Sequence, residues 1–224
     1  MSVNTVAYKE IIDQFLLTDT TLVAVSKTKP NEDILALYHL GQRDFGENYV
    51  QELVDKEAAL PKDIRWHFIG HLQSNKVKYI APFVHLIHGV DSLKLLREIN
   101  KQAAKCNRII PCLLQIYIAK EETKFGLDEG ELVEILDTIS SLPNIQIRGF
   151  MGMASFTEDS GVIKNEFRYL SQLLQKYQSM IKEHSGANPI LSMGMSGDYT
   201  IAIKEGSTMV RIGSMLFGAR NYTK

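Results

Sequence analysis

Two lysines follow an apolar run near the start of the chain, in TLVAVSKTKP, residues 21–30. Alternate residues of a strand face the same side, so Val23, Val25 and Lys27 should share one face. Lys27 is therefore predicted at the rim of the surface that the two valines line, whereas Lys29 fits a solvated lysine beyond the strand. A desolvated lysine near other cations loses its proton more readily and becomes a nucleophile towards an aldehyde.

Two short turns near the end of the chain combine glycine with serine, in MGMSGD (193–198) and RIGS (211–214). Each turn precedes a predicted helix, where unpaired backbone N–H groups and the helix dipole favour an anion. The residues predicted to contact the anion are Ser196, Gly197, Gly213 and Ser214. Such turns can also do no more than cap helices, and Asp198 is itself a candidate cap.

The elements that must position these residues alternate between strand-like and helix-like runs, eight times over. The strand-like runs are residues 21–26, 43–47, 64–70, 84–90, 109–118, 145–153, 189–195 and 208–214. Strands followed by helices in this number predict a single (β/α)₈ TIM barrel, with a doubly wound open sheet as the alternative. Residues 1–17 add an amphipathic N-terminal helix, and residues 1–224 read as one domain because no linker divides them.

Closure of the strands into a barrel would bring the lysine and the two turns together. Barrel chemistry lies at the carboxyl ends of the strands, and the loops after the seventh and eighth strands often bind phosphate. The eighth strand of a barrel neighbours the first, so a phosphorylated ligand there would lie beside Lys27. Pyridoxal 5′-phosphate supplies both the phosphate and an aldehyde, whereas an aldolase-like barrel would use the same lysine without a cofactor.

Five motifs, in order, resemble one known family: AVSKTKP, FGENYVQE, WHFIGHLQSNK, GMSGD and STMVRIGSMLFGAR. They are similar to the YggS/PROSC family of pyridoxal-phosphate homeostasis proteins, which share the barrel of the alanine racemase N-terminal domain. The similarity runs from about Leu22 to the end of the chain. It implies a barrel that binds pyridoxal phosphate, limits the free aldehyde in the cell and passes the cofactor to apoenzymes.

The resemblance also implies roles for individual residues. Lys27 would form the Schiff base, Arg211 would face the pyridine nitrogen, and Asn48 would lie near the polar edge of the ring. The implied phosphate cradle and pocket wall consist of Ser196, Gly197, Gly213, Ser214 and Met195. The family often has threonine at Ser214, which keeps the hydroxyl, and proline is common in some relatives where this chain has His71.

Cofactor binding and catalysis are separate expectations. Arg211 is a fixed cation that cannot protonate the ring nitrogen, so the ring would be a weak electron sink. Racemization also needs a second base, which in alanine racemases comes from an added β-domain and a second subunit; this chain resembles the barrel without that domain. We therefore expect a cofactor carrier without efficient catalysis, and the alternative is a low-activity pyridoxal-phosphate-dependent racemase or lyase.

Composition narrows the classes of partner. The net charge of −1 and a pI near 6.6 argue against nucleic acid, which requires clustered basic residues. No run is long enough to span a membrane. Two cysteines give no disulfide framework or metal spacing, so a reducing cytoplasm is the expected location, and we expect a monomer. His67 and His71 lack the glutamate of a zinc helix motif, so no metal site is predicted.

Overall fold

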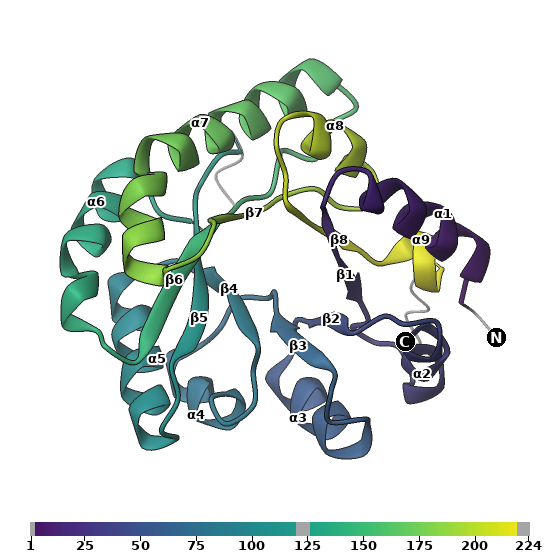
Figure 1. The fold of residues 1–224 in the computed structure, drawn as a ribbon, viewed down its shortest axis with the longest axis horizontal. Helices are drawn as coiled ribbons and strands as arrows, with labels where there is room; N and C mark the ends of the chain where they lie inside the picture. The colour runs from purple at the N-terminus through teal and green to yellow at the C-terminus, as the bar shows by residue number, and fades with distance from the viewer. Residues whose placement is uncertain (1–2, 120–125, 219–224) are drawn as a thin grey trace.

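Eight parallel strands close into a barrel in the computed structural model, which describes residues 3–119 and 126–218 (Figure 1). Each strand pairs with the next along the chain, and β1 pairs with β8 through Val23 and Arg211. The strands are β1 (Thr21–Val25), β2 (Asp44–Glu47), β3 (Arg65–Phe68), β4 (Leu86–Val90), β5 (Ile110–Gln115), β6 (Ile145–Met151), β7 (Ile190–Ser192) and β8 (Met209–Ile212). The predicted barrel is confirmed, and the open sheet is wrong.

The helices form the outer layer around the strands (Figure 1). They are α1 (Thr5–Leu16), α2 (Asn31–His39), α3 (Val50–Ala59), α4 (Val77–Ile80), α5 (Leu93–Lys105), α6 (Glu129–Thr138), α7 (Ser160–Ser185), α8 (Tyr199–Lys204) and α9 (Ser214–Phe217), with the 3₁₀ turns η1 (Ser74–Lys76) and η2 (Ile139–Ser141). In the described part of the chain, no helix combines the length and apolar character needed to span a membrane.

Caps and a left-handed glycine set the ends of two helices. Helix α2 begins at Asn31, and the extended Pro30, which has no side-chain donor or acceptor, occupies the cap position. Helix α7 begins at Ser160, after Asp159, whose carboxylate accepts from the first backbone N–H groups of the helix. Gly41, with φ of +101°, ends the α2 segment in a left-handed conformation.

Helix α1 is the predicted extra N-terminal helix. It begins after Asn4, whose side chain accepts a hydrogen bond from the N–H of Ala7. Its buried face carries Tyr8, Ile11 and Phe15, and it packs beside α9 and β1 (Figure 1). This contact covers the seam at which the first and last strands meet.

The core has two layers, as a packed barrel requires. The larger layer lies between strands and helices and includes Leu22 and Ala24 of β1. The smaller layer consists of Val23, Leu86, Leu113, Met151 and Met209, with Met153 and Ile190 partly buried against it. Alternate residues of β1 therefore enter different layers, which confirms the two-residue period read from the sequence.

Candidate functional site

A cavity of about 400 Å³ opens at the carboxyl ends of the strands. The structure brings all eight predicted site residues to its wall: Lys27, Asn48, Met195, Ser196, Gly197, Arg211, Gly213 and Ser214. Six further residues that were not predicted as site residues also line the cavity: Val25, Lys29, Ile69, Met153, Phe156 and Gly218. The size is typical of a small-molecule site.

Lys27 enters the cavity through the strand period and a tight turn. Val25 and Lys27 both line the cavity, whereas Ser26 between them is fully buried on the other side. Thr28 then adopts a left-handed φ of 63°, and the N–H of Lys29 donates to the Ser26 carbonyl at 3.0 Å. A non-glycine residue in this region is uncommon and marks a turn held by its surroundings.

A buried ionic cluster holds that turn from below, and sequence reasoning missed it. The Ser26 hydroxyl donates to Glu47 at 2.6 Å, and the Lys56 ammonium donates to the Ser26 carbonyl at 2.8 Å. Lys56 also pairs with Glu47 and Glu52 at 2.9 and 2.6 Å. The Thr28 N–H donates to Glu52 at 2.6 Å. The cluster therefore fixes both residues that flank Lys27; the only hint in the sequence was the acidic FGENYVQE segment.

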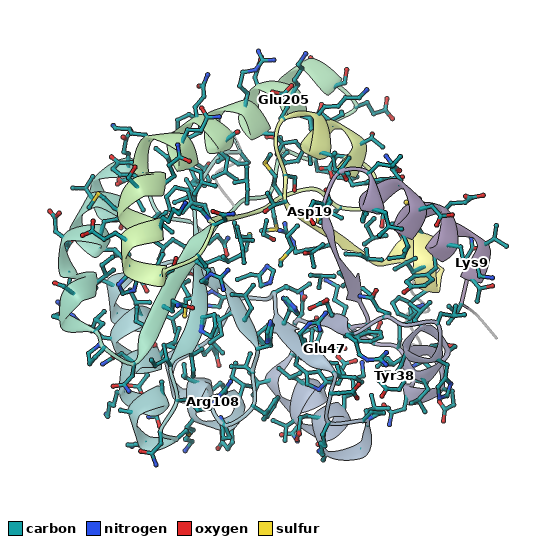
Figure 2. All side chains as sticks on the ribbon, viewed as in Figure 1. Lys9, Asp19, Tyr38, Glu47, Arg108 and Glu205 are labelled. Carbon is teal, nitrogen blue, oxygen red and sulfur yellow. The ribbon has the colours of Figure 1, made fainter. Side chains whose placement is uncertain are left out.

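Glu47 is the most perturbed carboxyl of this cluster. It is fully buried, and it lies well inside the outline of the molecule in Figure 2, whereas Glu205 lies at the edge. Burial raises the pKa of Glu47 to about 7, although the ammonium of Lys56 opposes the shift. Its second oxygen, Oε2, is buried without a hydrogen-bond partner among the described residues. The turn that contains Lys27 is therefore held by a carboxyl group whose pKa lies near neutrality.

Lys29 is not the solvated lysine expected from the sequence. It lies on the wall of the same cavity and donates from Nζ to the Phe217 carbonyl at 2.7 Å. The left-handed Thr28 turns the chain back, so the strand period cannot be continued to this position. Lys29 thereby connects the turn after β1 to α9, the element after β8.

The two Gly-Ser turns present unpaired backbone donors at the cavity. The N–H groups of Ser196, Gly197 and Ser214 have no hydrogen-bond partner among residues 3–119 and 126–218. A Cβ on Gly197 would project into open space, so the backbone there is accessible to a ligand. The helices that follow have only 6 and 4 residues, so any attraction for an anion would come from these N–H donors and not from a long helix dipole.

Hydrogen bonds within and between these turns shape the cradle. The N–H of Gly213 donates to Ser196 Oγ at 3.3 Å, which connects the loop after β7 to the loop after β8. The expected capping role of Asp198 is partly wrong. It occupies the cap position of α8 without a side-chain bond to that helix, and its carboxylate instead accepts from the N–H of Met195 at 2.6 Å.

Arg211 supplies a buried cation beside the cradle. Its Nη1 donates to Ser192 O and Oγ at 2.8 and 2.6 Å, and its Nη2 donates to Gly152 O at 3.0 Å. Its Nε has no hydrogen-bond partner in the described part of the chain. Burial lowers the pKa of Arg211 to about 10, so it stays a cation at neutral pH, and its Nε–H is available as a donor to a ligand.

Asn48 contributes an unpaired acceptor. Its Oδ1 is buried and has no partner among the described residues, although the residue lines the cavity. Gly70 lies directly behind it, since a Cβ there would approach the Asn48 carbonyl oxygen to 2.5 Å. A glycine at that place lets the segment after β3 pack closely against the Asn48 backbone. A buried polar atom without a partner at a cavity wall is typical of a ligand contact.

The histidines do not form the site that their spacing in the sequence first suggests. His67 lies inside the barrel, whereas His71 is exposed and contacts Asp91 at 3.2 Å. His88 lies on β4 with a hydrogen-bond partner at each ring nitrogen, whereas His85 precedes that strand and is exposed. Among the described residues, Asp44, His67 and His85 have donor atoms within 4.8 Å of one another. Asp44 is already paired there with Arg65, at 2.5 Å.

This architecture has counterparts among known proteins. The family described as the alanine racemase N-terminal domain matches residues 8–221. The chain belongs to this family. Curated members include the pyridoxal phosphate homeostasis protein of Aquifex aeolicus, 43% identical over 90% of this chain and 87% of that protein. The protein of the same name from Escherichia coli is 38% identical over 92% of this chain and 88% of its own.

Solved structures have the same fold. PipY of Synechococcus elongatus, solved with PLP bound, is 35% identical and superposes with a TM-score of 0.81 over 89% of this chain and 93% of its own. Alanine racemase of Bartonella henselae, 16% identical with a TM-score of 0.71, shares the fold over 99% of this chain and 62% of its own. The resemblance to the pyridoxal-phosphate homeostasis proteins is confirmed.

Proposed function

We propose that this chain is a pyridoxal phosphate homeostasis protein that binds pyridoxal 5′-phosphate in the cavity at the carboxyl end of the barrel. Its relatives carry that name, and PipY has been solved with PLP bound. The observation that carries the proposal is chemical: one cavity joins a lysine, a buried cation and a set of unpaired backbone donors. The cofactor contains a matching aldehyde, ring nitrogen and phosphate.

The residues fit the cofactor group by group. Lys27 supplies the amine for a Schiff base with the aldehyde. The unpaired Nε donor of Arg211 would face the pyridine nitrogen, and Asn48 would lie near the polar edge of the ring. The phosphate cradle and the adjoining wall are made by Ser196, Gly197, Gly213, Ser214 and Met195. Bound pyridoxal phosphate would supply an electrophilic carbon and, in enzymes, an electron sink.

We assign the site to cofactor holding and transfer rather than to turnover. Arg211 remains cationic and cannot give the ring nitrogen the proton that strong carbanion stabilisation needs. Among the described lining residues, the titratable side chains are Lys27, Lys29 and Arg211. The Nζ of Lys29 is held by the Phe217 carbonyl, away from the role of a second base. A racemase or lyase of low activity is the second candidate, favoured only by the shared fold.

The test is an absorption spectrum of the purified protein before and after borohydride, followed by peptide mapping. We expect a visible band that borohydride removes and an adduct on Lys27. Lys27→Ala should abolish the band, whereas Lys29→Ala should keep it with weaker cofactor retention. An adduct on Lys29, or no band after loading with pyridoxal phosphate, would contradict the proposal. A band also excludes the cofactor-free aldolase alternative.

The proposal extends to the assembly and partners of the chain. We expect residues 1–224 to act as one domain and as a cytoplasmic monomer that donates its cofactor to pyridoxal-phosphate-dependent apoenzymes. Sedimentation velocity of the purified protein tests whether it is a monomer. Donation of the cofactor is tested by reactivation of an apoenzyme by the loaded protein, in the presence of a phosphatase that destroys free pyridoxal phosphate, with Lys27→Ala as the control.

A further inference from the structure

A line of polar side chains crosses the barrel interior below the cofactor cavity. Ser192 Oγ lies 2.6 Å from Nη1 of Arg211 and 3.0 Å from Nδ1 of His88. Nε2 of His88 lies 2.9 Å from Nδ1 of His67, and Nε2 of His67 lies 2.9 Å from Oδ1 of Asp44. Five strands, β2, β3, β4, β7 and β8, thus contribute one residue each to a continuous chain of contacts.

The chain is buried almost throughout. Arg211 is 4% exposed, His67 is 1% exposed, and His88 and Ser192 are fully buried. The surrounding interior layer is apolar. Burying a polar group without a hydrogen-bond partner costs free energy, and here each polar side chain has the next one in the chain as its partner. Asp44 and His67 reach a second cavity of about 270 Å³ at the amino ends of the strands, so the chain connects the two ends of the barrel.

The two ends determine the direction of the hydrogen bonds. Arg211 has only donors, so Ser192 Oγ accepts from it. Burial alone would raise the pKa of Asp44, but hydrogen bonds from Arg65 and His67 lower it well below its usual range. Asp44 is therefore ionised and can only accept, so Nε2 of His67 carries the proton between them.

The middle of the chain then has one consistent arrangement. Burial holds the pKa of His88 well below its ordinary value, so that ring is neutral and has a single N–H. With Nε2–H of His88 donating to Nδ1 of His67, Nδ1 of His88 accepts the hydroxyl proton of Ser192. A cationic His67 would turn His88 round and leave the Ser192 hydroxyl proton without an acceptor in the chain.

We infer that Asp44, His67, His88 and Ser192 form a one-directional hydrogen-bond chain that orients the guanidinium of Arg211 in the cofactor cavity. They are positioning residues for Arg211, and this role rests on the proposed function. Ser192 matters most, because its hydroxyl both accepts from Arg211 and donates to His88. Asp44 acts from the opposite end of the barrel by fixing the tautomers of both histidines.

The first experiment needs no cofactor. Long-range ¹H–¹⁵N correlation spectra of the ¹⁵N-labelled, cofactor-free protein at neutral pH report which ring nitrogen carries the proton. We expect His67 and His88 both as neutral rings protonated at Nε2, with the exposed His71 as an internal reference. A proton on Nδ1 of either ring, or a cationic His67, would overturn the chain.

The second experiment tests positioning with matched serine variants. Ser192→Ala should weaken retention of pyridoxal phosphate roughly tenfold and shift its absorption band, because a buried donor of Arg211 loses its acceptor. Ser192→Thr keeps the hydroxyl and should retain the cofactor. Ser207→Ala removes another buried hydroxyl, bonded to Met193 O at 2.7 Å, and should have no effect on the band.

The outcomes separate the two proposals. Equal spectra and affinities for Ser192→Ala and Ser207→Ala would overturn the positioning role while leaving cofactor binding intact. If neither the unmodified protein nor any variant binds pyridoxal phosphate, the proposed function is contradicted. The histidine tautomers would still show whether the hydrogen-bond chain has the inferred direction.

Discussion

The two ends of the barrel use polar residues in opposite ways. At the carboxyl end, Ser196 and Gly197 leave N–H groups unpaired and Asn48 leaves an acceptor unpaired, all at a cavity of about 400 Å³. At the amino end, Asp44 is bonded to both Arg65 and His67. The carboxyl end therefore has donors and acceptors available for a ligand. At the amino end the charged groups pair with one another, as expected for the stabilising face of such a barrel.

The division is incomplete in two informative places. At the amino end, Nε of Arg148 is buried without a partner among the described residues. At the carboxyl end, Glu47, Lys56 and Glu52 form a paired cluster directly below the Lys27 turn. A binding site therefore combines groups left open for the ligand with a closed network that holds them, and the two can be perturbed separately.

The largest expected effect breaks the closed network. Lys56→Ala should lower the free energy of unfolding by about 3 kcal/mol or more at pH 8, because it leaves the buried Glu47 without its cation. The loss should be smaller at pH 5, where Glu47 can take up a proton. Denaturant unfolding at both pH values measures the difference.

Lys62→Ala is the matched control for that change. Lys62 pairs with Glu57 at 2.8 Å but is exposed, so its loss should cost less than about 1 kcal/mol. Equal effects of the two variants would show that the buried cluster contributes no more than a surface ion pair.

The next effect concerns the open cradle. Gly197→Val should abolish most cofactor retention and leave the unfolding midpoint nearly unchanged, because its side chain would enter open cavity space. Gly213→Val should reduce both, since a Cβ there already lies 3.3 Å from Val25. Cofactor absorbance after gel filtration and thermal unfolding separate the two results. Full retention by both variants would place the phosphate elsewhere.

A moderate effect distinguishes the two buried carboxyls by pH. Burial raises the pKa of Glu47 from 4.5 to about 7, so the folded protein holds a proton that the unfolded chain releases. Its contribution to stability should therefore fall, by an amount on the order of 2 kcal/mol, as pH rises from 4.5 to 7. Glu47→Gln should remove this slope from the measured unfolding free energies.

Asp44 should behave in the opposite sense. Its pKa is lowered from 3.8 in the folded state, so its contribution is present above that value and is lost as the pH falls below it. Asp44→Asn should thus reduce acid sensitivity below pH 3.8 and leave the slope between pH 4.5 and 7 in place. A change of slope in the higher window would show that Glu47 is not its source.

The smallest expected signal is catalytic. The unmodified protein should exchange the Cα proton of common amino acids negligibly, because Arg211 cannot protonate the ring nitrogen. Arg211→Glu should raise deuterium exchange measured by NMR, while inversion stays poor without a second base. Inversion by the unmodified protein at rates on the order of 1–10³ per second would favour the racemase alternative.

Local patterns in the sequence predicted much of the fold. Apolar residues recur with the period of a strand or of a helix within short stretches of the sequence. The eight units and the N-terminal helix could therefore be recognised without knowledge of tertiary contacts. The same period placed Val23, Val25 and Lys27 on one face, and barrel closure brought the two Gly-Ser turns to that face. These features depend on residues close in the chain and on a single rule of topology.

The tertiary structure alone decided the rest. The left-handed Thr28 returned Lys29 to the cavity, the cluster of Glu47 and Lys56 formed beneath the turn, and residues from five strands met between Asp44 and Arg211. Each depends on groups far apart in sequence, for which no periodicity exists. The physical reason is that burial makes every polar atom depend on a partner, and only the packed barrel determines which atoms are buried together.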